Sequence, residues 1–455
     1  MTPESLHPLR ALSPLDGRYA EAAAPLAEHF SEFAYLRDRA RIELDFLSAL
    51  SHAGLTRPLT AADSARLDSI KSAFSTADAE TILAHERVTR HDVKAIEYFL
   101  RDKLDLPDLL PWIHFGLTSE DTNNIALAIA LKESRDGVLV PALNSLLSGL
   151  SVFALRHRAL PMPARTHGQF AVPTTLGKEF AVYVARLEKV IAGISAFRFE
   201  AKLTGAVGNF NALHAAAPQV DWMSFSEDFI SGYGLEPNIV TTQILPYDNW
   251  VRYFDLLRLG NSILIDLSQD VWRYVSDGYL RQAVVSGEVG SSTMPQKVNP
   301  IDFENTEGNL GVANALFIQY AQKLTISRLQ RDLSDSTVRR TFGTGLGHSL
   351  VAWTSLERGL KRIAPDEEKL HAELMSHWEV VSEGAQTILR AVGKPDAYES
   401  LKEQTRGRVM TEDAYLTWCD TVDVDEDARH RLKNLSPETY LGLAAELTER
   451  VVKSK

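Results

Sequence analysis

The sequence predicts an all-α fold of three domains, the middle one a bundle of long helices. Apolar residues recur at intervals of three and four over several stretches of about 25 to 35 residues, the period of an amphipathic helix. No alternating apolar and polar pattern typical of strands separates these stretches. The chain has 455 residues with 45% hydrophobic content, a length that suggests about three domains.

The N-terminal part, 1–112, is predicted to be a helical domain. It begins with an irregular arm over 1–20. Helical periodicity then covers 25–50, and Gly54 ends it. A second helix is expected over 61–74 with Thr60 as its N-cap. A third helical pattern follows within 82–104, where the polar triplet Arg90-His91-Asp92 lies at a helix start.

The middle part, 113–364, carries the longest helical patterns. Pro141 predicts a kink in the first of them. Their apolar stripes are wide, which favours association of bundles from several subunits. The five patterns cover 121–160, 173–203, 248–282, 302–326 and 336–363. The remaining part, 365–455, has shorter helical patterns separated by Gly and Pro and is predicted to be a small C-terminal helical domain.

Composition restricts the classes of partner. The formal net charge is −12, from 60 acidic and 48 basic residues with no Lys/Arg block, so no nucleic-acid surface is expected. The single cysteine, Cys419, excludes an internal disulfide framework and a cysteine-based metal site, and fits a reducing compartment. No secretory signal and no apolar run of about 18 residues is present, so a soluble cytoplasmic protein without membrane contact is expected. No metal and no cofactor is expected.

The stretch 290–305, GSSTMPQKVNPIDFEN, combines hydroxyls, a lysine and two prolines with an acidic helix start. By composition alone, such a stretch is most often an ordinary surface loop. A second irregular segment, RTHGQ at 165–169, lies among prolines and holds His167 in a turn. A lone histidine there is more often a solvated imidazole than a catalyst.

Three further segments each allow a structural and a functional interpretation. The His91-Asp92 pair fits a helix cap or a catalytic pair. Thr118 and Ser119 precede acidic residues as in a capping box. The segment SRLQRDLSDSTVRR at 327–340 fits either a solvated charged face or a phosphate site built from arginines, hydroxyls and a helix start.

The string at 290–300 resembles the signature GSSxMPxKxNP of the fumarase/aspartase superfamily, lyases that release fumarate by β-elimination, and it matches every fixed position. The chain further resembles the adenylosuccinate lyases of the bacterial purine pathway from about residue 12 to the C-terminal domain. The segments that carry this resemblance are SPLDGRY, RHDVKAIEYFL, TSEDTNN, RTHGQ, GAVGNFNA and QRDLSDSTVRR.

The resemblance implies a C–N lyase that releases fumarate from adenylosuccinate, giving AMP, and from the succinyl-aminoimidazole-carboxamide ribotide. It implies Ser291 as the base and His167 as the general acid. A serine hydroxyl is a poor base in water, so the loop that carries it must close and exclude water. Lys297 and Asn299 would stabilise the carboxylate that takes up the second negative charge of the intermediate.

The resemblance also implies the substrate-binding residues and a homotetramer whose active sites are shared between subunits. On the phosphate and ribose side it places Arg18, Tyr19, Arg331, Ser336 and Arg340. Near the base and leaving group it places Arg90, His91 and Asp92. Near the succinyl carboxylates and the base it places Thr118, Ser119, Gln243, Ser292 and Asn305.

Two residues depart from the family pattern. Gln296 stands where many relatives carry histidine, and Arg90 where a small polar residue is common. Either could alter closure of the loop or substrate preference, and the sequence leaves open whether His91 shares the role of acid. Two other functions remain open: a fumarate-releasing lyase on another substrate such as argininosuccinate, and a non-catalytic helical protein. The arginine and serine cluster favours a phosphorylated substrate over the first, and the presence of Ser291, His167 and Lys297 argues against the second.

Overall fold

The computed structural model describes residues 7–283, 287, 293–294, 296–397, 399, 401–402 and 410–453. Contacts between Cα atoms divide the chain into two compact units. Unit 1 comprises 1–143, 190–262 and 308–352, and unit 2 comprises 144–189, 263–307 and 353–455. Helices dominate both units and the strands have only two or three residues each, which confirms the predicted helical class.

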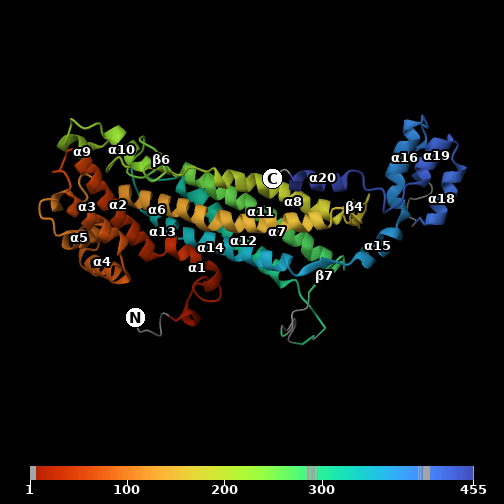
Figure 1. Cartoon of the computed structure of the whole chain (residues 1–455), viewed down its shortest axis with the longest axis horizontal. Helices are drawn as coiled ribbons and strands as arrows, with labels where there is room; N and C mark the ends of the chain where they lie inside the picture. The colour runs from red at the N-terminus through yellow and green to blue at the C-terminus, as the bar shows by residue number, and fades with distance from the viewer. Residues whose placement is uncertain are drawn as a thin grey trace. The chain divides into compact units, whose positions relative to one another are not determined.

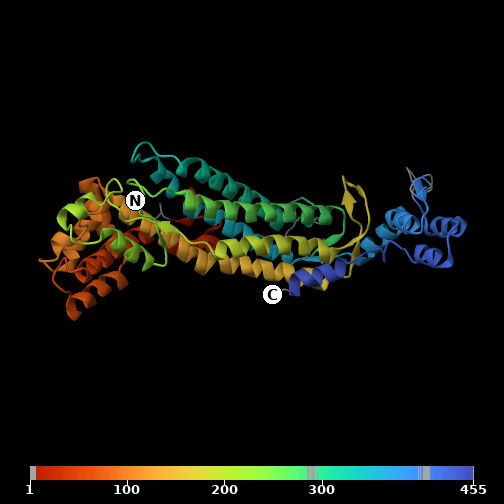
Figure 2. The same ribbon diagram turned by 90° about the horizontal axis from the view of Figure 1, so that it is seen from above.

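The long helices have residues in both units, and within each unit their segments run alongside one another in both views (Figures 1 and 2). They are α7 (Val140–Arg156), α8 (Leu176–Ser195), α11 (Asp248–Ser276), α12 (Ile301–Leu324) and α14 (Phe342–Leu360). A domain boundary at 112/113 or 364/365, as expected from the sequence, stays a prediction.

The first predicted helix, 25–50, is two helices in the structure. They are α1 (Ala20–Phe30) and α2 (Glu32–His52). Ser31 adopts an extended conformation between them, and its hydroxyl accepts a hydrogen bond from the backbone N–H of Ala34 at 3.2 Å. The hydroxyl thus satisfies a free donor of α2, which starts a new helix where the apolar periodicity alone predicted continuation.

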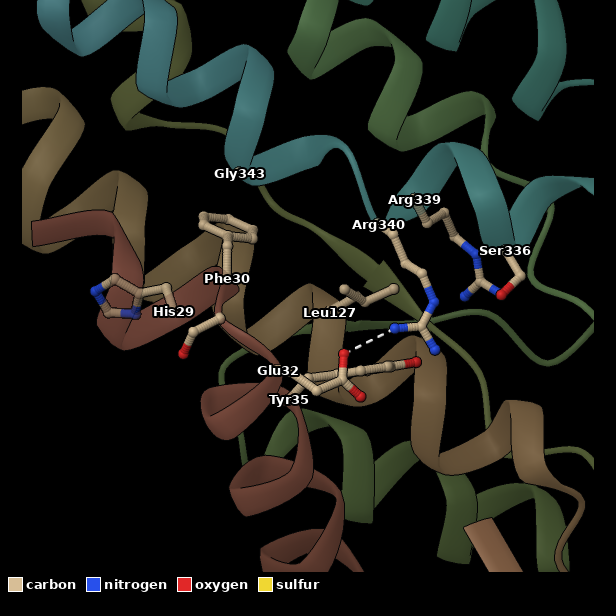
Figure 3. A pocket seen from close by; sticks show the side chains of 10 residues that line it. His29, Phe30, Glu32, Tyr35, Leu127, Ser336, Arg339, Arg340 and Gly343 are labelled. Atoms are coloured by element: carbon tan, nitrogen blue, oxygen red, sulfur yellow. Dashed lines mark hydrogen bonds and ion pairs between the residues drawn. The ribbon is translucent and has the colours of Figure 1, made fainter. Parts of the chain in front are cut away.

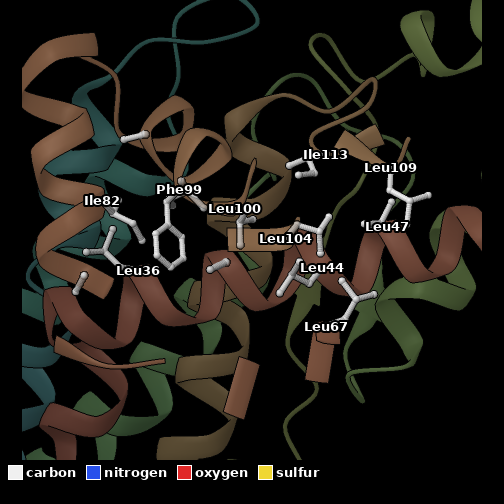
Figure 4. Packing of buried hydrophobic residues seen from close by; sticks show 14 residues of the cluster. Leu36, Leu44, Leu47, Leu67, Ile82, Phe99, Leu100, Leu104, Leu109 and Ile113 are labelled. Atoms are coloured by element: carbon white, nitrogen blue, oxygen red, sulfur yellow. The ribbon is translucent and has the colours of Figure 1, made fainter. Parts of the chain in front are cut away.

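The next helices pack on α2 through one apolar cluster that includes Leu36, Phe99 and Ile113 (Figure 4). They are α3 (Ala61–Ser72), α4 (Thr76–Thr89) and α5 (Asp92–Leu104). Thr60 caps α3 as predicted, within a capping box completed by Asp63. Arg90 ends α4 in the left-handed conformation, with φ of 56°, so α5 starts anew two residues later at Asp92, the last residue of the polar triplet.

Near Pro141, where a kink was predicted, the structure has a π-helical turn, Arg135–Leu139, between α6 (Ser119–Ser134) and α7. Proline lacks a backbone N–H and its ring crowds the carbonyl four residues earlier, here Gly137, so the helix widens just before it. By length and composition the whole stretch Ser119–Arg156 could cross a membrane, with a mean hydropathy of 1.9 in one window, which was not expected from the sequence. The stretch begins with buried charged residues, as the core helix of a soluble protein can.

Three other predicted helices are shorter than expected. The pattern 173–203 gives α8 only, because strand residues flank this helix. The helix predicted over 248–282 is α11, which ends at Ser276 before a short strand. The pattern 336–363 is divided between α13 (Ser334–Arg339) and α14. The strands are too short for the sequence to have shown them, because two or three residues fit the helical and the strand period equally well. The strand pairs are β1 (Pro161–Met162) with β4 (Thr174–Thr175), β2 (Arg165–Thr166) with β3 (Gln169–Phe170), β5 (Glu200–Ala201) with β6 (Glu236–Pro237), and β7 (Leu280–Gln282) with β8 (Ile363–Pro365).

Short helices complete the two units. Unit 1 also contains α9 (Asn211–Ala216), α10 (Trp222–Ser231) and the 3₁₀ helices Pro8–Arg10 and Leu110–Trp112. Unit 2 contains α15 (Glu367–Met375), the 3₁₀ helix Trp378–Val381, α16 (Ser382–Ala391), α18 (Glu412–Thr421), α19 (Glu426–Lys433) and α20 (Ala444–Lys453). A second apolar cluster, built around Trp378, Tyr415 and Leu432, supports the short C-terminal helices.

Candidate active site

The N-terminus of α6 organises the predicted site residues of unit 1. The predicted capping box is present there, and the carboxylate of Asp121 accepts a hydrogen bond from the backbone N–H of Thr118 at 2.8 Å. The same carboxylate pairs with the fully buried Lys202 at 2.8 Å and accepts from the backbone N–H of Thr204 at 3.0 Å. Asp121 therefore ties Thr118 and Ser119 to the glycine-rich loop 204–210.

Glu120, the residue after Ser119, is a buried carboxylate that no sequence pattern indicated. It pairs with Arg331 at 2.8 Å and with Arg339 at 2.8 and 3.1 Å, and it accepts a hydrogen bond from the hydroxyl of Tyr247 at 2.7 Å. Burial raises the pKa of Glu120, but the charges of Arg339 and Arg331 outweigh it and hold the pKa below its ordinary value. Arg331, expected on the phosphate side, is thus engaged at the start of α6.

Arg39 links Asp92 to the first turns of α6. Its guanidinium, fully buried, donates to Asp92 at 2.7 Å and to Asn123 on α6 at 3.3 Å. Burial raises the pKa of Asp92, but the nearby Arg39 lowers it to below its ordinary value. Arg39 carried no motif that would have revealed it in the sequence, because it lies inside an ordinary amphipathic helix.

His91 is the N-cap of α5, which confirms the capping interpretation. Its Nδ1 accepts a hydrogen bond from the backbone N–H of Lys94 at 3.2 Å. With Nδ1 as acceptor, a neutral ring carries its proton on Nε2. His91 is exposed, as is Arg90 beside it, so capping leaves Nε2 available as a proton donor. Gln243 lies between two loops: its backbone N–H donates to Gln330 and its side chain to Ala206.

Ser336 and Arg340 line a cavity together with Glu32, Tyr35 and Arg339 (Figure 3). Arg340 pairs with Glu32 at 2.8 Å. A second cavity is lined by Arg340 and by residues of the arm that precede Arg18, including Ser13 and Asp16. Arg340 thus lines both cavities, one with Ser336 and the other with residues of the arm. The side chain of Arg18 is exposed, that of Tyr19 is partly buried, and neither lines these cavities, so their place on the phosphate side stays a prediction.

In unit 2, His167 occupies the turn between β2 and β3. Its φ is 53°, a left-handed conformation that non-glycine residues seldom adopt, and its side chain is exposed. Arg165 holds the base of this hairpin. Its guanidinium pairs with Glu373 at 3.0 Å, donates to the hydroxyl of Tyr279 at 3.3 Å and stacks on Phe170 at 3.9 Å.

We expect the Arg165→Ala variant to lower kcat by about tenfold with little change in the thermal midpoint, because a catalytic group displaced by a fraction of an ångström loses alignment with its substrate. Steady-state kinetics and thermal unfolding would measure both. Arg186→Ala on α8, which removes a surface pair with Asp266 of α11, is the matched control. Equal kcat values for the two variants would refute the anchoring role of Arg165.

The loop motif is described only in part. Ser291 and Ser292 lie outside the described residues. Lys297 is exposed, and its backbone N–H donates to Met294 at 3.1 Å. Asn299 and Asn305 are partly buried, Asn305 on the first turns of α12, where the sequence predicted a helix start.

A histidine–carboxylate pair, partly buried on the histidine side, lies just before Thr118. His114 contacts Glu43 at 2.7 Å. Burial lowers the pKa of His114, but the charge of Glu43 and the hydrogen bond to it raise the pKa above its ordinary value. The pair therefore contributes its stability fully below pH 6.5, and this contribution is lost as the pH rises through the raised pKa.

We accordingly expect the free energy of unfolding of the wild type to fall between pH 6 and pH 9. This fall should exceed that of His114→Gln by about 1–2 kcal/mol, the size of a hydrogen bond to a charged group. Urea unfolding at both pH values would measure the difference. Parallel pH dependence of the two proteins would contradict it.

Comparisons with known proteins show the family of the chain. The profile of a family described as Lyase matches residues 17–314, and that of a family described as Adenylosuccinate lyase C-terminal matches 327–441. The chain is 44% identical over 453 residues to an adenylosuccinate lyase of Haemophilus influenzae, covering 98% of this chain and 99% of the relative. The chain belongs to the adenylosuccinate lyase family.

Other relatives of this family extend beyond bacteria. An adenylosuccinate lyase of Escherichia coli K12 is 43% identical, covering 98% of this chain and 99% of its own. One from Dictyostelium discoideum is also 43% identical, and the match covers 96% of this chain and 97% of that relative. Solved structures confirm the fold: a fumarate lyase from Mesorhizobium sp. BNC1 aligns with a TM-score of 0.76 at 15% identity, covering 95% of this chain and 98% of that one. A 3-carboxy-cis,cis-muconate lactonizing enzyme from Pseudomonas putida aligns with a TM-score of 0.73 at 19% identity, covering 94% and 96%.

Proposed function

We propose that this protein cleaves adenylosuccinate to AMP and fumarate, and the succinyl-aminoimidazole-carboxamide ribotide to its aminoimidazole product and fumarate. The observation that carries the proposal is the match over nearly the whole chain to adenylosuccinate lyases. The cavity lined by Ser336 and Arg340 supports it independently, because a guanidinium and a hydroxyl bind a phosphate by charge-assisted hydrogen bonds.

In the proposed reaction Ser291 removes a proton from the succinyl carbon next to a carboxylate. The electron pair moves into that carboxylate, where Lys297 and Asn299 stabilise the added charge. The C–N bond then breaks, and His167 gives a proton to the departing nitrogen. The elimination is redox-neutral, and its roles need only side chains of the protein. His91 is a second candidate for the acid, since its Nδ1 is engaged in capping and Nε2 carries the proton.

For the substrate-binding residues, we propose that the phosphate and ribose lie toward Ser336, Arg340 and the arm with Arg18 and Tyr19. The succinyl end lies toward Thr118, Ser119, Gln243, Ser292 and Asn305, and the leaving group near Arg90, His91 and Asp92. Arg331, whose guanidinium pairs with Glu120, acts by fixing the start of α6 in addition to any contact with the ligand. The protein would be soluble and cytoplasmic.

Turnover tests the proposal directly. Purified protein should convert adenylosuccinate to AMP and fumarate without added metal or cofactor, and the ultraviolet spectrum of the purine follows the reaction. Argininosuccinate should not be cleaved, since it offers no phosphate to Ser336 and Arg340. Absence of turnover with both succinylated nucleotides would refute the assignment.

The shared-site homotetramer is a further part of the proposal. If each site is built from several subunits, mixing inactive Ser291→Ala and His167→Ala proteins produces some sites that contain neither substitution. Activity should then return in the mixture, while sedimentation reports the tetramer. A mixture that exchanges subunits and stays inactive would refute shared sites.

A further inference from the structure

The carboxylate of Glu32 occupies the cavity lined by Ser336 and Arg340. Glu32 is the first residue of α2, and its Oε2 lies 2.8 Å from Nη1 of Arg340 (Figure 3). Its other oxygen, Oε1, lies 3.9 Å from Nη2 of the fully buried Arg39. A single carboxylate therefore lies between two guanidinium groups.

Both buried arginines beside this carboxylate have unused donors. Among the described residues, Nη2 of Arg39 and Nε of Arg339 are buried and have no hydrogen-bond partner. A buried N–H without a partner costs free energy, and an oxygen-rich anion that reached it would recover that cost. The side chain of Glu32 is about half exposed, at 47%, so it can turn toward water without repacking the core.

The charges of this region balance only because of Glu32. Four guanidinium groups face four carboxylates in two sets of ion pairs, one around Glu32 and one around Glu120. Arg39 pairs with Asp92, and Arg331 and Arg339 share Glu120, with Asp335 also on Arg339. The remaining guanidinium, Arg340, has Glu32 as its partner. A phosphate monoester added to this balanced set would find no net positive charge, and it would lie against the like charge of Glu32 unless Glu32 withdraws.

We propose that Glu32 is a stand-in for the phosphate of the ligand, holding Arg340 in the free protein and leaving it when a nucleotide monophosphate binds. A phosphate monoester carries a charge of about −1.5 to −2 at pH 7 and three acceptor oxygens, whereas a carboxylate carries −1 and two oxygens. The exchange therefore satisfies more donors, and it penalises ligands that lack the phosphate. The inference rests on the proposed function, since it assumes that Ser336 and Arg340 receive the phosphate.

The test compares binding of AMP and of adenosine to the full chain by calorimetry. Glu32→Gln keeps the length of the side chain and an oxygen that can accept from Arg340, but removes the competing charge. We expect this variant to bind AMP about fivefold more tightly than the wild type, as for removal of a half-exposed ionic competitor, and to bind adenosine equally well. The matched control is Glu28→Gln, which removes the same charge from the exposed face of α1 outside this cavity and should bind both ligands like the wild type.

Two results would overturn the inference. Weaker or unchanged AMP binding by Glu32→Gln would mean that Glu32 positions Arg340 for the ligand or is irrelevant to it. An equal change for adenosine would mean that the substitution altered the cavity as a whole. A failure of the proposed function would be distinguishable from these results. If the protein did not turn over succinylated nucleotides, but Glu32→Gln still bound AMP and inorganic phosphate more tightly and adenosine equally well, the inference about Glu32 would stand. A thermal midpoint close to that of the wild type verifies that the variant is folded.

Discussion

We expect the His167→Ala variant to lose about 10²–10⁴-fold in kcat, the usual contribution of a positioned general acid. Alanine cannot give a proton to the departing nitrogen, so the C–N bond would break to an unprotonated, poor leaving group. The exposed turn at the tip of β2–β3 makes few contacts that a smaller side chain would lose, so folding should be little affected. Single-turnover kinetics would separate the chemical step from binding and product release.

His52→Ala is the matched control, because His52 is also exposed but lies at the C-terminal end of α2. It should keep wild-type kcat. If His167→Ala retained near wild-type turnover, the acid would be another group, and His91 would be the first to examine. A His91→Ala variant with the larger loss would then transfer the role to Nε2 of that ring.

The second large effect is expected on stability. Glu120→Gln should lower the free energy of unfolding by about 3–5 kcal/mol, because it leaves Arg331 and the buried Arg339 without their shared counter-charge. Urea unfolding would measure the loss. Glu426→Gln, at a side chain that is 96% exposed, is the control and should stay within about 0.5 kcal/mol of the wild type.

The Glu120 cluster also predicts a pH dependence. Because the pKa of Glu120 is lowered in the folded protein, its contribution is fully present above the ordinary value of 4.5 and is lost as the pH falls through the lowered pKa. The wild type should therefore lose stability between about pH 5 and pH 3 more steeply than Glu120→Gln. Identical acid titrations of stability would contradict the assignment of this carboxylate.

Local signals in the sequence predicted much of the fold, and they failed where a single polar side chain redirected the backbone. Thr60 predicted the start of α3 from the sequence, because a threonine before a helical pattern is a typical N-cap, and the structure adds Asp63 as the second half of a capping box. Ser31 was overlooked because apolar periodicity continues on both sides of it. The hydroxyl contact with the backbone N–H of Ala34 ends one helix and starts another, although the stripe persists.

Some residues of the candidate site were likewise recognisable from the sequence, and others were not. The motifs around His167, Thr118 and 290–300 were recognisable as strings, since each combines residue types that a loop or helix start needs. Glu120, Arg39 and Glu32 were not recognisable, because each lies in a helix and acquires its role only from a partner far along the chain. Arg331 lies 211 residues after Glu120, and Arg340 lies 308 after Glu32.

The sequence by itself determined the helical class, the family, and the residues that could carry an elimination, because these depend on periodicity and short strings. Only the tertiary structure decided which charges neutralise one another. A buried guanidinium is tolerated only beside a carboxylate, and which carboxylate reaches it depends on how α2, α6 and α13 pack. The resting partner of Arg340 is consequently Glu32, a residue that the strings gave no reason to select.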